Sequence, residues 1–169
     1  EIPFLHNPLK LTLAKDNAPF LVDIYIDGVW RRRRVCDSGK VVSRRNIEVY
    51  DDLQVPVPSP ENDIHIVAFH AYHDLELSLA EIMHGLHILL NSQDKISTYI
   101  LMDLAEKYLS YNSLYFYLRS LLEFNNYISE TFSFNLVYRL DILKSILDEL
   151  RDRYVMCKKI DKMFDMRYT

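Results

Sequence analysis

An abrupt change of hydrophobic period at Val55-Pro56-Val57-Pro58-Ser59-Pro60 constrains this chain more than any other feature. Proline fixes its own φ and disfavours helix in the residue before it, so residues 55–58 are expected to form an extended connector. Ser59-Pro60-Glu61 is a typical helix start, with an N-cap serine, a proline in the first helical position and an acid near the positive end of the helix dipole. The sequence therefore divides into a part before residue 58 and a helical part after it.

β-Branched and aromatic residues dominate the part before this boundary and predict strands. Turns are expected at Asn17-Ala18-Pro19 and at Cys36-Asp37-Ser38-Gly39, and the second turn creates a basic hairpin. A small antiparallel or mixed β-sheet is therefore expected over residues 1–58. Its strands are expected at residues 11–13, 20–27, 29–35, 41–45 and, at the edge, 47–53.

After the boundary, apolar residues recur every three or four positions, which is the spacing of amphipathic helices. About five helices are expected over residues 59–169, so the fold class is α+β: a small sheet followed by a helical bundle. The helices are expected at Ser59 to about Asp74, along the stripe Leu79 to Leu90, from Asp94 or Ser97 to Leu109, from Asn112 or Ser113 to about Phe124, and from Ser133 or Asn135 past Arg153.

Composition indicates a folded protein of a reducing compartment, because 49% of the 169 residues are hydrophobic, 26% are charged and the two cysteines match no disulfide framework or metal-ligand spacing. No apolar run reaches the roughly 18 residues of a membrane span, and the first residues do not follow the plan of a signal peptide. We therefore expect a cytoplasmic protein. With three glycines, the chain has no phosphate-binding loop, dinucleotide fingerprint or nucleophile elbow.

Positive charge is concentrated in the expected hairpin. The part before the boundary carries nine Lys or Arg against eight Asp or Glu, whereas the helical part carries eleven against sixteen. Alternation along a strand places Arg31 and Arg33 on one face and Arg32 and Arg34 on the other. Arginine binds phosphates in a bidentate manner, so one face suits a triphosphate or a nucleic-acid backbone. A solvated edge strand, whose charges prevent aggregation, explains the same pattern.

Asp23 and Asp27 fall on one face of the expected second strand. They lie about 13 Å apart along an extended chain, too far to share one metal ion unless the strand bends. Asp23 is therefore the better single candidate for a metal-binding carboxylate. In the alternative interpretation Asp27-Gly28 is an ordinary hairpin turn and Asp23 a solvated strand residue.

The pairs His70-x-x-His73 and His84-x-x-His87 each place two imidazoles on one helical face. If the two helices pack together, the four rings could converge, with Asp74 nearby, into a zinc or iron site. The pattern lacks the glutamate of His-Glu-x-x-His zinc enzymes, and a hydrogen-bonded core histidine is the commoner finding. These four histidines are therefore the alternative metal ligands.

The order of the pieces resembles a family. Val22-Asp23-Ile24-Tyr25, the basic hairpin, the proline connector and Ile66 to Tyr72 are similar to the uncharacterised nucleotidyltransferases of the polymerase-beta superfamily, over about residues 18–125. The resemblance implies nucleotidyl transfer from a nucleoside triphosphate, with two Mg²⁺ ions held by three carboxylates. Asp23 matches the third carboxylate and is thereby implied as the catalytic and metal-binding residue, while Arg31, Arg33 and Arg44 are implied to contact the nucleotide.

In that family the other two carboxylates follow a Gly-Ser turn that this chain lacks, because the motif would lie upstream of Glu1. We therefore expect either the C-terminal part of a larger enzyme, with residues 1–58 as a partial catalytic sheet, or a degenerate relative kept for binding. The alternative is a non-enzymatic module, in which the hairpin binds nucleic acid or an acidic partner and the acidic helices mediate assembly. The sequence leaves the oligomeric state, the acceptor and the preferred nucleotide open.

Overall fold

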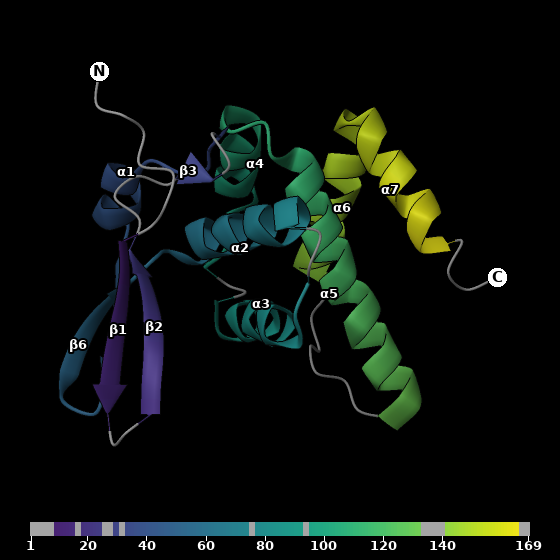
Figure 1. The fold of residues 1–169 in the computed structure, drawn as a ribbon. Coiled ribbons are helices and arrows are strands. Elements are labelled where there is room, and N and C mark those ends of the chain that lie inside the picture. The colour runs from purple at the N-terminus through teal and green to yellow at the C-terminus, as the bar shows by residue number, and fades with distance from the viewer. Residues whose placement is uncertain are drawn as a thin grey trace.

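The computed structural model describes residues 9–15, 18–24, 29–30, 33–74, 77–92, 95–132 and 141–165. Within these ranges it is an α+β fold, as predicted, with short antiparallel strand pairs before residue 58 and a helical bundle after it (Figure 1). The strand-to-helix change falls where the proline connector placed it, since the helix α2 begins at Pro60. The division into two domains at this point stays a prediction.

The described strands form three separate antiparallel pairs rather than one sheet. β1 (Leu9–Lys15) pairs with β2 (Ala18–Ile24), β3 (Val29–Trp30) with β4 (Arg33–Arg34), and β5 (Asn46–Tyr50) with β6 (Leu53–Val57). The proline connector is thus extended, as expected, but it is also a strand of a hairpin that turns at Asp51 with a φ of 53°. Aspartate tolerates this left-handed region better than most residues.

The strand predicted over residues 41–45 is wrong, because residues 38–43 form the helix α1 (Ser38–Ser43). The Asp37 carboxylate caps this helix by accepting a hydrogen bond of 3.3 Å from the Lys40 backbone N–H. At the other end, the backbone N–H of Arg44 closes the last turn onto Lys40 O and Val42 O. Two β-branched valines favour a strand locally, but the aspartate cap ahead of them favours a helix start.

Six helices follow the connector within the described residues, one more than expected. Ser97 caps α4, as predicted, whereas α5 continues eight residues beyond Phe124. The long last helix was predicted to be continuous, but it is interrupted at Tyr154, and its expected start at Ser133 or Asn135 lies outside the described residues. The helices are α2 (Pro60–Asp74), α3 (Leu79–Ser92), α4 (Thr98–Lys107), α5 (Tyr111–Phe132), α6 (Asp141–Arg153) and α7 (Val155–Asp165).

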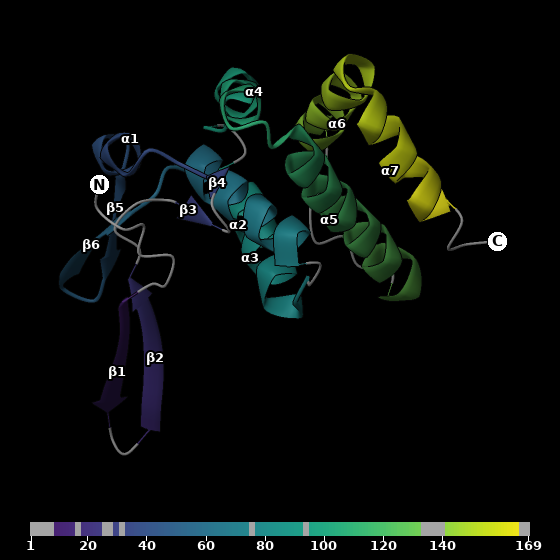
Figure 2. The ribbon, with the colours of Figure 1, turned by 45° about the horizontal axis from the view of Figure 1, so that its top comes forward.

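The helix α5 runs through the middle of the bundle, with α2 and α3 on one side and α6 and α7 on the other (Figures 1 and 2). Its amphipathic sequence buries Leu114, Tyr117, Leu118 and Leu121 completely. Among the residues whose burial the structure describes, the main apolar cluster lies between Ile64 and Ile160, so the helical part builds it. The strand pairs lie at the end of the molecule away from α7 (Figure 2).

The thiols of Cys36 and Cys157 are buried and no disulfide joins them. Among the described residues, no helix combines the length and apolar character that crossing a membrane requires.

Candidate functional site

Asp23, the predicted catalytic and metal-binding carboxylate, lies in β2 next to its last residue. In the register of the β1–β2 pair it stands opposite Lys10. The strands β1 and β2 make their main contacts with each other. The structure thus places Asp23 in a two-stranded hairpin, with Lys10 rather than a second carboxylate at the opposite position.

Of the three predicted nucleotide-binding arginines, Arg31 lies outside the described residues. Arg33 lies in β4, opposite Trp30 of β3. Arg44 is the C-cap of α1 and is exposed. The expectation that these arginines lie in one strand hairpin is wrong for Arg44, because this residue ends the helix α1 and not a strand. Arg33 lies in the β3–β4 pair.

Five exposed cations nevertheless gather around α1, and we refer to Arg34, Lys40, Arg44, Arg45 and Lys107 as the α1 basic surface. Four come from the segment around the short helix, and Lys107 comes from the end of α4. Asp37 is the carboxylate among them: its oxygen lies 3.8 Å from the Arg34 guanidinium.

The pKa of the Asp37 carboxyl reflects the positive charges near it. The hydrogen bond from the Lys40 backbone, followed by the nearby charges of Arg34, Lys107 and Lys40, lowers the pKa of this carboxyl below its ordinary value. The Lys107 ammonium lies 4.8 Å from the centre of the Tyr108 ring, and its contact with Tyr108 raises the pKa of Lys107.

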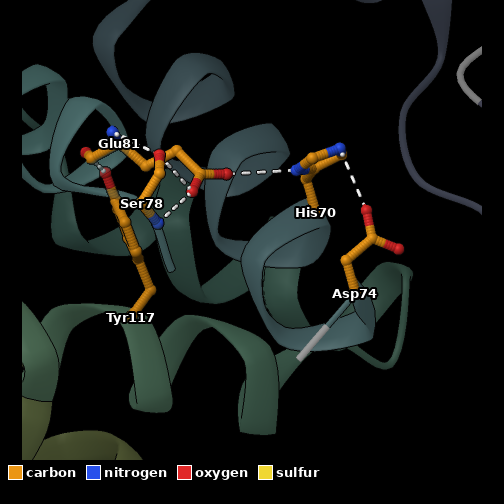
Figure 3. A network of polar contacts seen from close by, with 5 residues as sticks. All are labelled: His70, Asp74, Ser78, Glu81 and Tyr117. Carbon is orange, nitrogen blue, oxygen red and sulfur yellow. Dashed lines mark hydrogen bonds and ion pairs between the residues drawn. The ribbon is translucent and has the colours of Figure 1, made fainter. Parts of the chain in front are cut away.

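The four histidines predicted as alternative metal ligands make separate contacts. His70 lies between two carboxylates: Nδ1 is 3.1 Å from Glu81 Oε1 on α3, and Nε2 is 3.1 Å from Asp74 Oδ2 (Figure 3). His70 is thus a bridge between α2 and α3.

Glu81 itself belongs to a capping box at the start of α3 (Figure 3). Its carboxylate accepts hydrogen bonds from the Ser78 backbone N–H at 2.7 Å and from the Ser78 hydroxyl at 2.8 Å, while the Ser78 hydroxyl accepts from the Glu81 N–H. Partial burial opposes its charge, but the bonds from Ser78 and His70 lower the pKa of Glu81. These contacts define a structural role for His70.

The other three histidines also have local partners. His84 Nε2 lies 3.1 Å from Asp63 on α2, the amide of Asn91 lies 3.1 Å from the His87 ring, and the His73 ring packs on Phe69 with centroids 4.1 Å apart. The part of the chain that the structure describes contains no group of three or more His, Cys, Asp or Glu arranged to hold a metal ion. The four histidines do not converge there.

Sequence reasoning missed a buried polar group at the junction of α2, α4 and α5. His65 is 1% exposed, and its Nε2 lies 2.6 Å from the Ser110 hydroxyl, which is equally buried. Burial lowers the pKa of His65 to about 4. Glu61, one turn earlier and also buried, accepts a 2.8 Å hydrogen bond from the Ser97 N–H at the start of α4. The available signal was the spacing of Glu61 and His65 on the apolar face of α2.

No family model matches the chain, and no curated protein and no solved structure matches it either. The proposed function therefore rests on the contacts and charges of this chain's own residues.

Proposed function

We propose that this protein is a nucleic-acid-binding module that contacts phosphates through the α1 basic surface. The observation that carries the proposal is that five exposed cations lie at or beside α1, where the charges of Arg34, Lys40 and Lys107 are close enough to Asp37 to lower the pKa of its carboxyl. Arginine and lysine at such a surface neutralise phosphates and release counterions, which is the main source of affinity for nucleic acid.

The charge of the rest of the chain supports a local contact surface. The protein has a formal net charge of −4, whereas residues 33–46 contain five Lys or Arg and one acid. A polyanion is repelled by the molecule as a whole and attracted only where cations gather.

The proposal is tested by fluorescence anisotropy with labelled RNA and DNA of about 20 nucleotides over a series of salt concentrations. If three to five phosphates are neutralised, the logarithm of the association constant falls against the logarithm of salt with a slope of about −2 to −4. In Lys40→Glu/Arg44→Glu we expect at least about tenfold weaker binding and a shallower slope.

The matched control is Lys158→Glu/Lys159→Glu, which makes the same change in net charge on exposed positions of α7. We expect it to bind within about twofold of the wild type at 0.15 M salt, where screening weakens distant charges. Equal losses in both variants, or no binding by the wild type at low salt, would contradict the proposal.

Nucleotidyl transfer is a second candidate, favoured by the match of Val22-Asp23-Ile24-Tyr25 to the polymerase-beta superfamily. It is tested by melting the protein with Mg²⁺ and each nucleoside triphosphate. A nucleotide-dependent rise in Tm that both Asp23→Ala and Arg31→Ala/Arg33→Ala abolish would support it. If no nucleoside triphosphate raises the Tm, the result contradicts nucleotidyl transfer as the function.

A further inference from the structure

The outer face of α3 is apolar and free of charged acids and bases. Leu79, Met83 and Leu90 are 62%, 46% and 39% exposed, and together with His87 they follow the four- and three-residue steps that form one stripe along a helix. None of the exposed residues of α3 is Lys, Arg, Asp or Glu: they are Leu79, Ala80, Met83, His84, His87, Leu90 and Asn91.

The opposite face of the same helix is buried in the bundle. Gly85, Leu86, Ile88 and Leu89 are buried, and the principal neighbours of α3 are α2 and α5. The helix therefore carries apolar side chains on its exposed side as well as on its buried side. Figure 1 shows α3 at the lower margin of the bundle, below α2.

Charge distinguishes this face from the exposed apolar face of α7. On α7, Val155, Met156 and Met163 are interspersed with the exposed lysines 158, 159 and 162. Two copies meeting through that face would bring like charges together. Two copies of the α3 face meet without such repulsion, so this face is complementary to itself.

We propose that the protein forms a homodimer in which the α3 helices of two copies pack antiparallel about a twofold axis. In this arrangement Leu79 lies beside the partner's Leu90, and Met83 lies near the partner's His87. His84, held by Asp63, and Asn91, in contact with His87, supply polar groups beside this stripe.

The length of the helix sets the expected strength of the dimer. Fourteen residues span about 21 Å, which places the interface at the small end of specific ones. We therefore expect a concentration-dependent dimer with a Kd on the order of micromolar. The proposal is independent of nucleic-acid binding, because α3 carries none of the α1 basic surface.

The test is sedimentation velocity of the whole chain from about 1 µM to about 500 µM, a range that brackets this Kd. The wild type is expected to shift from monomer to dimer, and Met83→Glu to stay monomeric because a pair of carboxylates would be buried at the axis. The control Met163→Glu makes the same change on α7 and is expected to dimerise normally. Circular dichroism checks that both variants are folded. A wild type that is monomeric throughout, or a dimer that Met83→Glu leaves intact, overturns the proposal.

Cross-linking tests the orientation separately. With a short bis-maleimide, the double variant Leu79→Cys/Leu90→Cys is expected to give a covalent dimer well above the wild-type background, because each cysteine faces its counterpart in the partner. Either single variant places its two cysteines at opposite ends of the helix pair and is expected to stay at background. Efficient cross-linking of the single variants would exclude the antiparallel pair.

Discussion

At the residue scale, Gly85 allows α3 and α5 to approach closely. A Cβ atom at this position would overlap the Tyr117 hydroxyl and lie 2.8 Å from Leu121 Cδ1. The hydroxyl is fixed in place, because it donates a 2.7 Å hydrogen bond to the Glu81 carbonyl. We expect Gly85→Ala to lower the free energy of unfolding by about 1–3 kcal/mol through overpacking, measured by urea denaturation.

The control is Gly39→Ala on the exposed surface of α1, where the nearest atom is 3.3 Å away and alanine favours the helix. We expect that variant to be neutral or slightly stabilising. Tyr117→Phe removes the oxygen that a Cβ at position 85 would overlap. We therefore expect Tyr117→Phe to lower the free energy of unfolding less in the Gly85→Ala variant than in the wild type. Additive losses would show that the hydroxyl is not the obstacle.

His65 provides the second prediction at this scale. Its pKa is about 4 in the folded protein and about 6.5 in an unfolded chain, so the unfolded chain binds the extra proton first as the pH falls. The stability contributed by neutral His65 is full above about pH 6.5 and is lost between there and pH 4. Between pH 7 and pH 4.5 the free energy of unfolding is expected to fall by about 2–3 kcal/mol more in the wild type than in His65→Gln.

The measurement is urea denaturation of both proteins at several pH values in this range. His87→Gln, at an exposed ring, serves as the control for a general effect of removing a histidine. If His65→Gln declines as steeply as the wild type, the burial of His65 does not govern the acid sensitivity.

The sequence located some of these residues and missed others for physical reasons. The basic stretch that includes Arg44 was recognisable, because clustered charge at the surface needs no tertiary information. His65 was not, because its burial depends on Ser110, 45 residues away, and periodicity cannot report such a partner. His70 was recognised as a pair with His73, yet its actual partners are the carboxylates of Asp74 and Glu81.

At the element scale, α7 is attached to α5 through a charged contact rather than by apolar packing alone. Arg119 of α5 lies 2.7 Å from Glu123 on its own helix and 3.7 Å from Asp161 of α7, and its guanidinium lies 5.8 Å from the Phe164 ring centre. The three charged side chains are about four-fifths shielded from solvent. Loss of the arginine would leave Asp161 partly buried without its cation.

We therefore expect Arg119→Met to destabilise the docking of α7 by about 1–3 kcal/mol. Hydrogen exchange followed by mass spectrometry should accelerate in residues 155–165 while α2 stays protected. The control Arg151→Met breaks an exposed pair with Asp148 on α6, which is worth at most about 1 kcal/mol. Unchanged exchange in α7 would show that the apolar contacts hold this helix alone.

The helices α2 and α4 were predictable because each has its own stripe and its own start signal, and α3 was predictable from its stripe alone. The interruption at Tyr154 was not, since the apolar period continues across it. There the Tyr154 ring stacks on Tyr111 of α5, with ring centres 3.9 Å apart and planes within 1°. A contact between residues 43 positions apart leaves no trace in local periodicity.

At the scale of the whole molecule, the apolar core and the strand pairs are separate. Among the residues whose burial the structure describes, the main apolar cluster lies between Ile64 and Ile160, with Val35 and Cys36 buried outside it. Ile47, Val49 and Leu53 of the β5–β6 hairpin are exposed by half or more. An isolated two-stranded hairpin is marginally stable in water. The free energy of folding should therefore come almost wholly from the helical part.

This separation predicts that residues 58–169 fold without the preceding part. We expect the fragment to melt cooperatively by circular dichroism, with a Tm within about 5 °C of the whole chain, because a loss of 1 kcal/mol shifts a domain of this size by roughly 4–8 °C. The fragment 1–58 should show no cooperative transition. Since the fragment 58–169 lacks four of the five cations around α1, it should also lose affinity for nucleic acid while keeping its helices. A fragment 58–169 that fails to melt cooperatively would show that the strand pairs stabilise the bundle, and that the boundary at Pro58 separates two kinds of secondary structure but not two folding units.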